Sequence, residues 1–213
     1  MRILITAGPT REYLDDVRYL SNASTGRMGY ALAAAAKATG NRVTLVHGPT
    51  PEAPPEVDKT IAVTSACGMF EAVAAEFPAC DVLIACAAVS DYRPKERIDG
   101  KLKRESAESL TLTLVQNPDI VREMAARRRA DQAVICFALE TADGEANARA
   151  KLARKGADAI VLNMASAIGA DETEITVLFA ESSESTTFRG SKAEAARLIL
   201  AIAELIVHTK SDG

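Results

Sequence analysis

Short apolar runs alternate with Ala-rich segments from one end of the chain to the other, and this alternation limits the possible folds more than any other feature. The runs are bounded by Gly, Pro, Asp or Asn and predict strands at Arg2–Thr6, Arg42–Val46, Thr60–Val63, Val82–Cys86, Leu110–Val115, Ala133–Ala138, Ala159–Leu162 and Ile175–Phe179. Between most of them, helical spacing predicts helices at Gly29–Thr39, Ser65–Phe77, Pro118–Arg129, Glu145–Lys155 and Lys192–Val207. A chain of this kind is expected to form a parallel sheet covered by helices.

Several of the predicted strands are apolar without interruption, as residues 82–86 are, which favours burial on both faces of a central sheet. We therefore predict an α/β fold with a Rossmann-like, doubly wound, mainly parallel sheet in three α/β/α layers. A chain of 213 residues can bury one such core, so we expect a single domain over residues 1–213. Ligands of these sheets bind outside the carboxyl ends of the strands, so the segments that leave the strands are where chemistry is expected.

Charge and cysteine usage narrow the classes of partner. The net charge of −4 argues against a broad basic face, so no nucleic-acid partner is expected. The four cysteines form no C-x-x-C pair and suggest reduced thiols of a cytoplasmic protein. No apolar run reaches membrane-spanning length, and the first apolar run is too short for a signal peptide, so no membrane association is expected.

A loop of about twenty residues separates the first strand from the first helix, and loops of that length are commonly functional. It ends in Ser21–Gly29, where hydroxyls, an amide, glycines and backbone N–H groups meet a helix N-terminus and suit an anion. An equally open interpretation is that Ser24 or Thr25 only caps the helix. A dinucleotide site is less supported, because G-x-G-x-x-G is absent and no acidic residue directly follows the second strand.

The segment after the fourth strand is rich in small residues that would let a nucleotide approach the backbone. Within it, Asp91 suits a sugar, a base or a metal, and equally an Asx turn before Arg93. Further on, Lys101 and Lys103 fall on one side of an extended segment. A compact cation suits a transferring phosphate, although most such runs are only solvated.

Later segments have structural explanations of their own. Asn117 and Pro118 are predicted to cap and open a helix. Phe137 either joins the core or packs against a nucleobase. Lys151 and Lys155 share one helix face, where solvent exposure is the default expectation.

Five motifs occur in order and, taken together, resemble those of one family. They are G-P-T-R-E at 8–12, S-N-x-S-[ST]-G-x-M-G at 21–29, A-A-V-x-D-Y at 87–92, K-x-K at 101–103 and N-P-D-I at 117–120. Over nearly its whole length the chain resembles the phosphopantothenoylcysteine synthetases, which occur alone or as the C-terminal half of a bifunctional flavoprotein. Two departures concern Leu139, where the family often has Ala, and the loosely matching segment Ala165–Glu174.

The resemblance implies a ligase of coenzyme A biosynthesis that joins 4′-phosphopantothenate to cysteine. The substrate carboxylate would attack the α-phosphate of CTP to give an acyl cytidylate and pyrophosphate, and the cysteine amine would then displace CMP. The resemblance favours CTP but leaves ATP open. It also implies Mg²⁺ with the triphosphate, no flavin, and a homodimer in which the long middle region is a clasp.

The resemblance assigns Asn22 and Lys101 as catalytic, Asn22 at the substrate carboxylate and Lys101 at the triphosphate. Nucleotide-binding residues would be Gly8, Ala87, Ala88, Asp91, Lys101, Pro118, Asp119, Ile120, Phe137, Lys151 and Lys155. Substrate-binding residues would be Asn22, Ser24, Thr25, Gly26 and Met28. No cluster of protein metal ligands is visible. Alternative functions are an NAD(P)-dependent oxidoreductase on the same fold and a non-catalytic nucleotide-binding subunit.

Overall fold

The computed structural model describes residues 1–103, 109–140, 144–164 and 172–211, and its centre is an eight-stranded sheet. Of the eight strands of this sheet, the six that come first in the chain run parallel to one another. The last two, at one edge, pair antiparallel with their neighbours. In sheet order they are β12 (Ser185–Ser191), β11 (Glu172–Phe179), β10 (Ala159–Met164), β9 (Ala133–Glu140), β6 (Val82–Ala85), β1 (Arg2–Ala7), β4 (Arg42–His47) and β5 (Lys59–Ala62).

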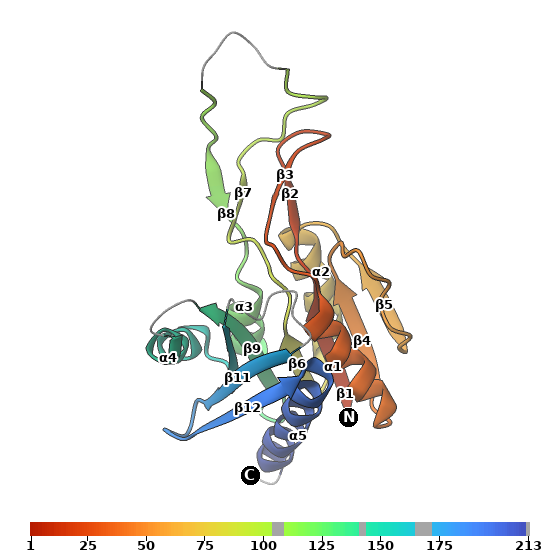
Figure 1. The fold of residues 1–213 in the computed structure, drawn as a ribbon, viewed down its shortest axis with the longest axis vertical. Coiled ribbons are helices and arrows are strands. Elements are labelled where there is room, and N and C mark those ends of the chain that lie inside the picture. Colours follow the sequence, from red (N-terminus) through yellow and green to blue (C-terminus); the bar gives the residue numbers. More distant parts are fainter. Residues whose placement is uncertain (104–108, 141–143, 165–171, 212–213) are drawn as a thin grey trace.

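Helices cover both faces of this sheet (Figure 1). One face is covered by α1 (Arg27–Ala38) and α5 (Lys192–Ser211). The other is covered by α2 (Ala66–Glu76), which continues into the 3₁₀ turn η1 (Phe77–Ala79), together with α3 (Ile120–Arg127) and α4 (Gly144–Lys155). The predicted three-layer, mainly parallel α/β fold is confirmed.

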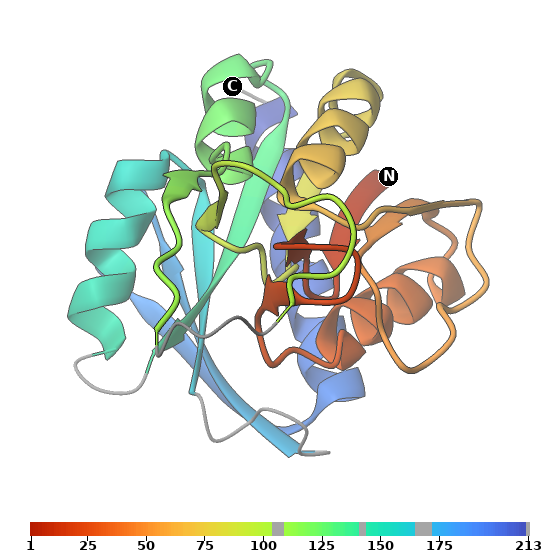
Figure 2. The same cartoon turned by 90° about the horizontal axis from the view of Figure 1, so that it is seen from above.

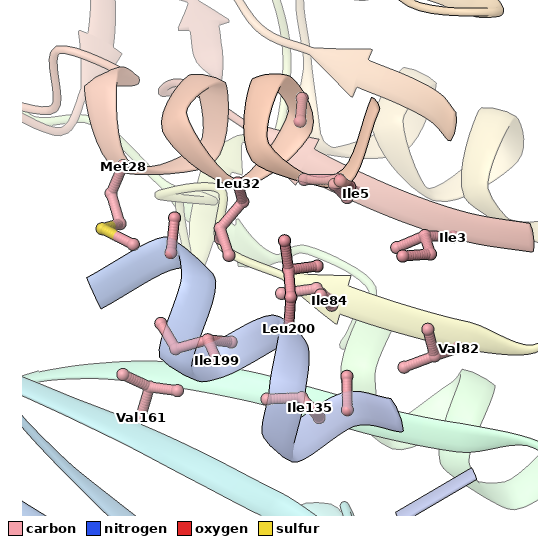
Figure 3. Close-up of a cluster of buried hydrophobic side chains, with 14 of the residues drawn as sticks. Ile3, Ile5, Met28, Leu32, Val82, Ile84, Ile135, Val161, Ile199 and Leu200 are labelled. Carbon is pink, nitrogen blue, oxygen red and sulfur yellow. The ribbon is translucent and has the colours of Figure 1, made fainter. Parts of the chain in front are cut away.

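Two apolar clusters, one on each face, hold the layers together. Ile3 and Ile5 of β1 face α1 and α5, while Leu4 between them faces α2 and α3, because successive side chains of a strand point to opposite faces. Figure 3 shows the first cluster, in which Leu32 of α1 and Leu200 of α5 lie among strand side chains. Burial on both faces explains the uninterrupted apolar runs of the sequence.

A second part of the chain projects from the carboxyl ends of the strands (Figure 1). It contains the hairpin β2 (Arg11–Tyr13) with β3 (Tyr19–Ser21), and the pair β7 (Tyr92–Pro94) with β8 (Leu114–Gln116). We call residues 11–21, 92–103 and 109–116 the arm, and the rest the body. Seen from above, the arm lies over the strand ends of the sheet (Figure 2).

One strand predicted for the central sheet lies in the arm instead. Residues 110–115 were expected to form a strand of the central sheet, but only Leu114–Gln116 is a strand, and it pairs with β7 outside that sheet. Leu110, Leu112 and Leu114 are exposed instead of buried. Their alternation with threonines is the pattern of a strand with one apolar face, not of one buried on both faces. The hairpin in the long first loop and the polar edge strand β12 were not predicted.

Candidate functional site

Two adjoining cavities lie at the carboxyl ends of the central strands. The α3/α4 cavity, of about 680 Å³, lies between the end of β6 and helices α3 and α4. The α1 cavity, of about 440 Å³, lies at the start of α1. They share the lining residues Ala87, Val89, Asp91, Phe137 and Lys151. The position agrees with the expected one for ligands of an open parallel sheet.

Glycines bring the start of α1 against the end of β1. Gly26 is the N-cap of α1 with φ of +78°, a conformation that favours glycine. A Cβ at Gly29 would lie 2.5 Å from the Cβ of Ala7, so the helix could not pack this closely with a side chain there. Neither Ser24 nor Thr25 is the cap of α1. The first turn of α1 contains no acidic residue and borders the cavity, as an anion-binding helix start requires.

Asn22 lies at the mouth of the α1 cavity with its amide already oriented. Its Nδ2 donates a hydrogen bond to the carbonyl oxygen of Ala88 at 3.1 Å. The backbone N–H of Ala88 in turn donates to the carbonyl of Gly8 at 2.9 Å. An amide nitrogen carries two hydrogens, so the second donor of Asn22 and its Oδ1 acceptor are left for a ligand.

The loop after β6 is fixed by two threonines. The hydroxyl of Thr6 accepts from the backbone N–H of Ala87 at 3.1 Å, and that of Thr10 accepts from Ser90 at 3.0 Å. Both threonines are buried. Sequence reasoning did not select them, although a threonine inside or just after an otherwise apolar strand is a signal for such a contact.

The lysines of α4 are part of the α3/α4 cavity, so the expectation of solvent exposure was wrong. Lys155 Nζ donates to Asp119 Oδ2 at 2.6 Å, and the Lys155 side chain is only 17% exposed. Lys151 Nζ donates to the carbonyl of Phe137 at 3.1 Å. Each lysine is thus held by one partner while it lines the cavity.

The start of α3 also differs from its prediction. Asp119, not Asn117, is the N-cap, and its Oδ1 accepts from the backbone N–H of Arg122 at 3.2 Å. Asn117 instead links the start of the arm to the cavity. Its Nδ2 donates to the carbonyl of Ser90 at 2.8 Å, and its Oδ1 accepts from Arg93 at 3.1 Å.

Asp91 and Phe137 lie where the two cavities meet. In the described part of the chain, the Asp91 carboxylate makes no hydrogen bond or ion pair, so the Asx turn that was the alternative is not formed. Phe137 is half-buried in the second half of β9. Lys192, at the start of α5, lines the α1 cavity as well, and sequence reasoning missed it because it lies far from every motif.

The cavities gather every predicted site residue except two. Gly8 lines neither cavity; it lies beneath them, with φ of +74°, against Thr50 and Gly26. Lys101 is exposed on the arm, outside the lining of both cavities. Residues 165–171 of the loosely matching segment lie outside the described residues.

Cations outnumber acids around the two cavities. The α3/α4 cavity is lined by four cations, Arg122, Lys151, Arg154 and Lys155, and by two acids, Asp91 and Asp119.

Over residues 1–103, 109–140, 144–164 and 172–211, no group of three His, Cys, Asp or Glu side chains suits a metal. Over the same ranges no helix has the length and apolar character needed to cross a membrane.

Comparison with known proteins gives a consistent result. The family described as the DNA/pantothenate metabolism flavoprotein C-terminal domain matches residues 1–206. The coenzyme A biosynthesis bifunctional protein CoaBC of Vibrio vulnificus strain YJ016 is 40% identical over 211 residues, covering 97% of this chain and 53% of that protein. The chain therefore spans about half the length of the curated relatives that it matches.

Solved structures agree with the sequence matches. The crystal structure of the C-terminal domain of CoaBC is 37% identical, with a TM-score of 0.81 and 98% of each chain covered. A Cab2 H337A mutant in complex with phosphopantothenate-cysteine is 16% identical, with a TM-score of 0.78, covering 98% of this chain and 88% of the other. The second likeness shows the fold alone.

Proposed function

This chain belongs to the family of DNA/pantothenate metabolism flavoprotein C-terminal domains, and we propose that it is a phosphopantothenate–cysteine ligase of coenzyme A biosynthesis. One observation carries the proposal. The cation-lined α3/α4 cavity, of about 680 Å³, adjoins the α1 cavity at the N-terminus of α1, and Asn22 lines the α1 cavity. Such a pair of sites holds a nucleoside triphosphate beside a second anionic substrate. The four free thiols fit a cytoplasmic protein.

In the first step, CTP occupies the α3/α4 cavity, with its phosphates near Lys151 and Lys155. Phe137 offers an apolar surface for the nucleoside. The carboxylate of 4′-phosphopantothenate attacks the α-phosphorus, the bond to the β-phosphate breaks, and pyrophosphate leaves. The cations lower the barrier because negative charge builds up on the phosphates in the transition state. The remaining Nδ2 donor of Asn22 orients the carboxylate.

In the second step, the cysteine amine attacks the acyl carbon of the acyl cytidylate. An amide bond forms, the bond between the acyl carbon and the phosphate oxygen breaks, and CMP leaves while the amine loses a proton to solvent. The Oδ1 of Asn22 is an acceptor for an amine N–H at this point. One side chain can therefore act in both steps.

Mg²⁺ is proposed to enter with the triphosphate and to neutralise its charge. Asp91 is the carboxylate best placed to contact such a complex, because it lines both cavities and has no partner among the described side chains. The donor set fits a metal that is bound mainly by phosphate oxygens.

We further propose a homodimer in which the arm of one subunit completes the site of the other. Lys101 lies on the arm and outside the cavities of its own chain. The arm also exposes large apolar side chains, namely Val17, Tyr19, Tyr92, Ile98, Leu110, Leu112 and Leu114. An apolar surface of this kind marks a protein interface. In a dimer formed through this surface, Lys101 of one subunit would lie at the triphosphate bound by the other subunit.

Pyrophosphate release tests the function and the nucleotide together. The purified chain is incubated with Mg²⁺ and 4′-phosphopantothenate, with CTP or ATP, before and after cysteine is added. We expect phosphopantothenate-dependent release with CTP, and continued turnover only with cysteine. Lys37→Gln, an exposed change on α1 remote from the cavities, is the control.

Two results would point to the alternatives. A folded chain that binds CTP but releases no pyrophosphate with either nucleotide would be a non-catalytic binding subunit. Tight NADPH binding without release would favour the oxidoreductase. No observation in the structure favours either of these over the ligase.

A further inference from the structure

Asp15, which no motif analysis selected, is a buried carboxylate at the tip of the β2–β3 hairpin. Its side chain is fully buried. Oδ1 accepts from the backbone N–H groups of Val17 at 2.7 Å and Arg18 at 2.6 Å. Oδ2 accepts from Arg18 Nη1 at 3.1 Å and from the backbone N–H of Leu102 at 3.0 Å. Both oxygens are therefore in use, and one of them reaches a distant part of the chain.

Leu102 stands between Lys101 and Lys103, so this hydrogen bond fixes the backbone of the K-x-K motif. Neighbouring contacts hold the same segment. Arg18 Nη1 also donates to the Leu102 carbonyl at 3.0 Å. The N–H of Asp16 donates to the Gly100 carbonyl at 3.1 Å. Residues 14–18 thus clamp residues 98–102 by hydrogen bonds on both sides of Lys101.

The clamp is not needed to form the body. The two apolar clusters that hold the helices on the sheet include no residue of the arm among the described residues. In the part of the chain that the structure describes, neither Lys101 nor Lys103 has a side-chain partner. Burying a carboxylate is costly unless hydrogen bonds compensate for it, and here the four bonds to Val17, Arg18 and Leu102 do so. What the clamp determines is where two free ammonium groups can lie.

We propose that Asp15 is a positioning residue that holds Lys101 at the place where the arm delivers a cation to the triphosphate. This inference rests on the proposed ligase function. A cation contributes to phosphoryl chemistry only when it is held close to the developing charge, and small displacements are costly. Burial acts to raise the pKa of Asp15, but hydrogen bonds from the backbone of Arg18, Val17 and Leu102 hold it below its usual value. The Asp15 carboxylate is therefore charged at neutral pH.

Asp15→Asn is the sharpest variant because it has nearly the same shape. Its carbonyl oxygen can still accept from Val17 and Arg18, but an NH₂ group would face the N–H of Leu102 and the Arg18 guanidinium, where only an acceptor fits. Asp16→Asn is the matched control. It removes only the ion pair of Asp16 with Arg97 at 2.8 Å. Both side chains are exposed, so this pair contributes little to stability.

The experiment measures pyrophosphate release in Asp15→Asn, Lys101→Gln and the double variant, all as full-length proteins. If Asp15 acts through Lys101, Asp15→Asn should lower kcat about tenfold or more in the wild-type background and not at all in the Lys101→Gln background, because the two changes remove one interaction. The KM for cysteine and the melting temperature should stay unchanged. An equal loss in both backgrounds, or wild-type kcat in Asp15→Asn, would overturn the proposal.

Amide hydrogen exchange gives a readout that does not need activity. In Asp15→Asn the Leu102 amide should exchange at least about tenfold faster than in wild type, while the amides of β1 keep their rates. If wild type releases no pyrophosphate, the proposed function fails, and exchange alone decides on the clamp. Unchanged exchange at Leu102 would then refute it.

Discussion

The body and the arm use apolar residues in opposite ways. In the body, Leu4 and Ile84 are completely buried between sheet and helices. In the arm, Val17 is 57% and Leu110 is 59% exposed, and the hairpin is held by polar contacts around Asp15 and by ring contacts of Tyr13 and Tyr19. The difference indicates that the body is stable by its own packing, and it supplies most of the cavity lining. The apolar side chains of the arm are exposed, and in the proposed homodimer they would contact a second copy.

The largest effect is expected from a truncation in the body. Leu4→Ala should lower the free energy of unfolding by about 2–5 kcal/mol, because it leaves a cavity between β1 and the α2 layer. Leu110→Ala, the same change in the arm, should alter the unfolding of the monomer by less than about 0.5 kcal/mol. Urea unfolding at a protein concentration below dimer formation compares the two. Similar losses would contradict the division into body and arm.

The arm should show its effect in association instead. Replacing exposed Tyr92 by Ala is expected to weaken the dimer by about 2 kcal/mol, roughly thirtyfold in Kd, if the aromatic ring is an anchor at the interface. Sedimentation at several protein concentrations measures the change. The control is Leu205→Ala on α5, which removes a comparably exposed side chain far from the arm. A wild-type chain that stays monomeric at micromolar concentration would remove the interface altogether.

The cavities of the body should respond to loss of a positive charge. Lys155→Gln removes the cation that Asp119 holds in the α3/α4 cavity, and it is expected to raise the KM for CTP about tenfold, or roughly 1.4 kcal/mol. Lys59→Gln, which breaks an exposed pair with Glu76, should leave the KM unchanged. Steady-state kinetics at saturating phosphopantothenate and cysteine separates the two. An equal KM in both variants would show that the phosphates lie elsewhere.

The smallest effect concerns a thiol in the body. Burial raises the pKa of Cys86 to about 12, and a raised thiol pKa favours the neutral form. At pH 8 only about one molecule in ten thousand carries the thiolate, which is the reactive species. Iodoacetamide should therefore modify Cys86 of the native protein very slowly, and about tenfold faster for each pH unit up to pH 10. Peptide mass spectrometry measures this, and rapid modification at pH 8 would contradict it.

The sequence predicted the body well because burial on both faces leaves long apolar runs. The runs at β1 and β4 match the observed strands to within one residue. Strand β12 was missed because Ser185–Ser191 is polar at the sheet edge and depends on β11 for its pairing. The alternating residues 110–115 were assigned to the wrong sheet because periodicity does not tell which partner a strand has.

The site shows the same limit. Motif residues on neighbouring strand ends were expected to meet, and the α1 and α3/α4 cavities bring them together. The default expectation that Lys155 is exposed to solvent was wrong because a helix pattern cannot show that Asp119 lies opposite it. Asp15 escaped notice because its partner Leu102 is 87 residues away in the sequence. Contacts of this range follow from the fold and not from local spacing.

The most direct test of the account is a mixing experiment with two strongly impaired variants, Asn22→Asp and Lys101→Gln. Each variant should release little pyrophosphate alone. If Lys101 serves the partner's site, a coexpressed one-to-one mixture contains mixed dimers with one intact site, and should recover about a quarter of the wild-type activity per subunit. No recovery in a mixture shown to contain mixed dimers would mean that Asn22 and Lys101 act in the same chain, and would contradict the account.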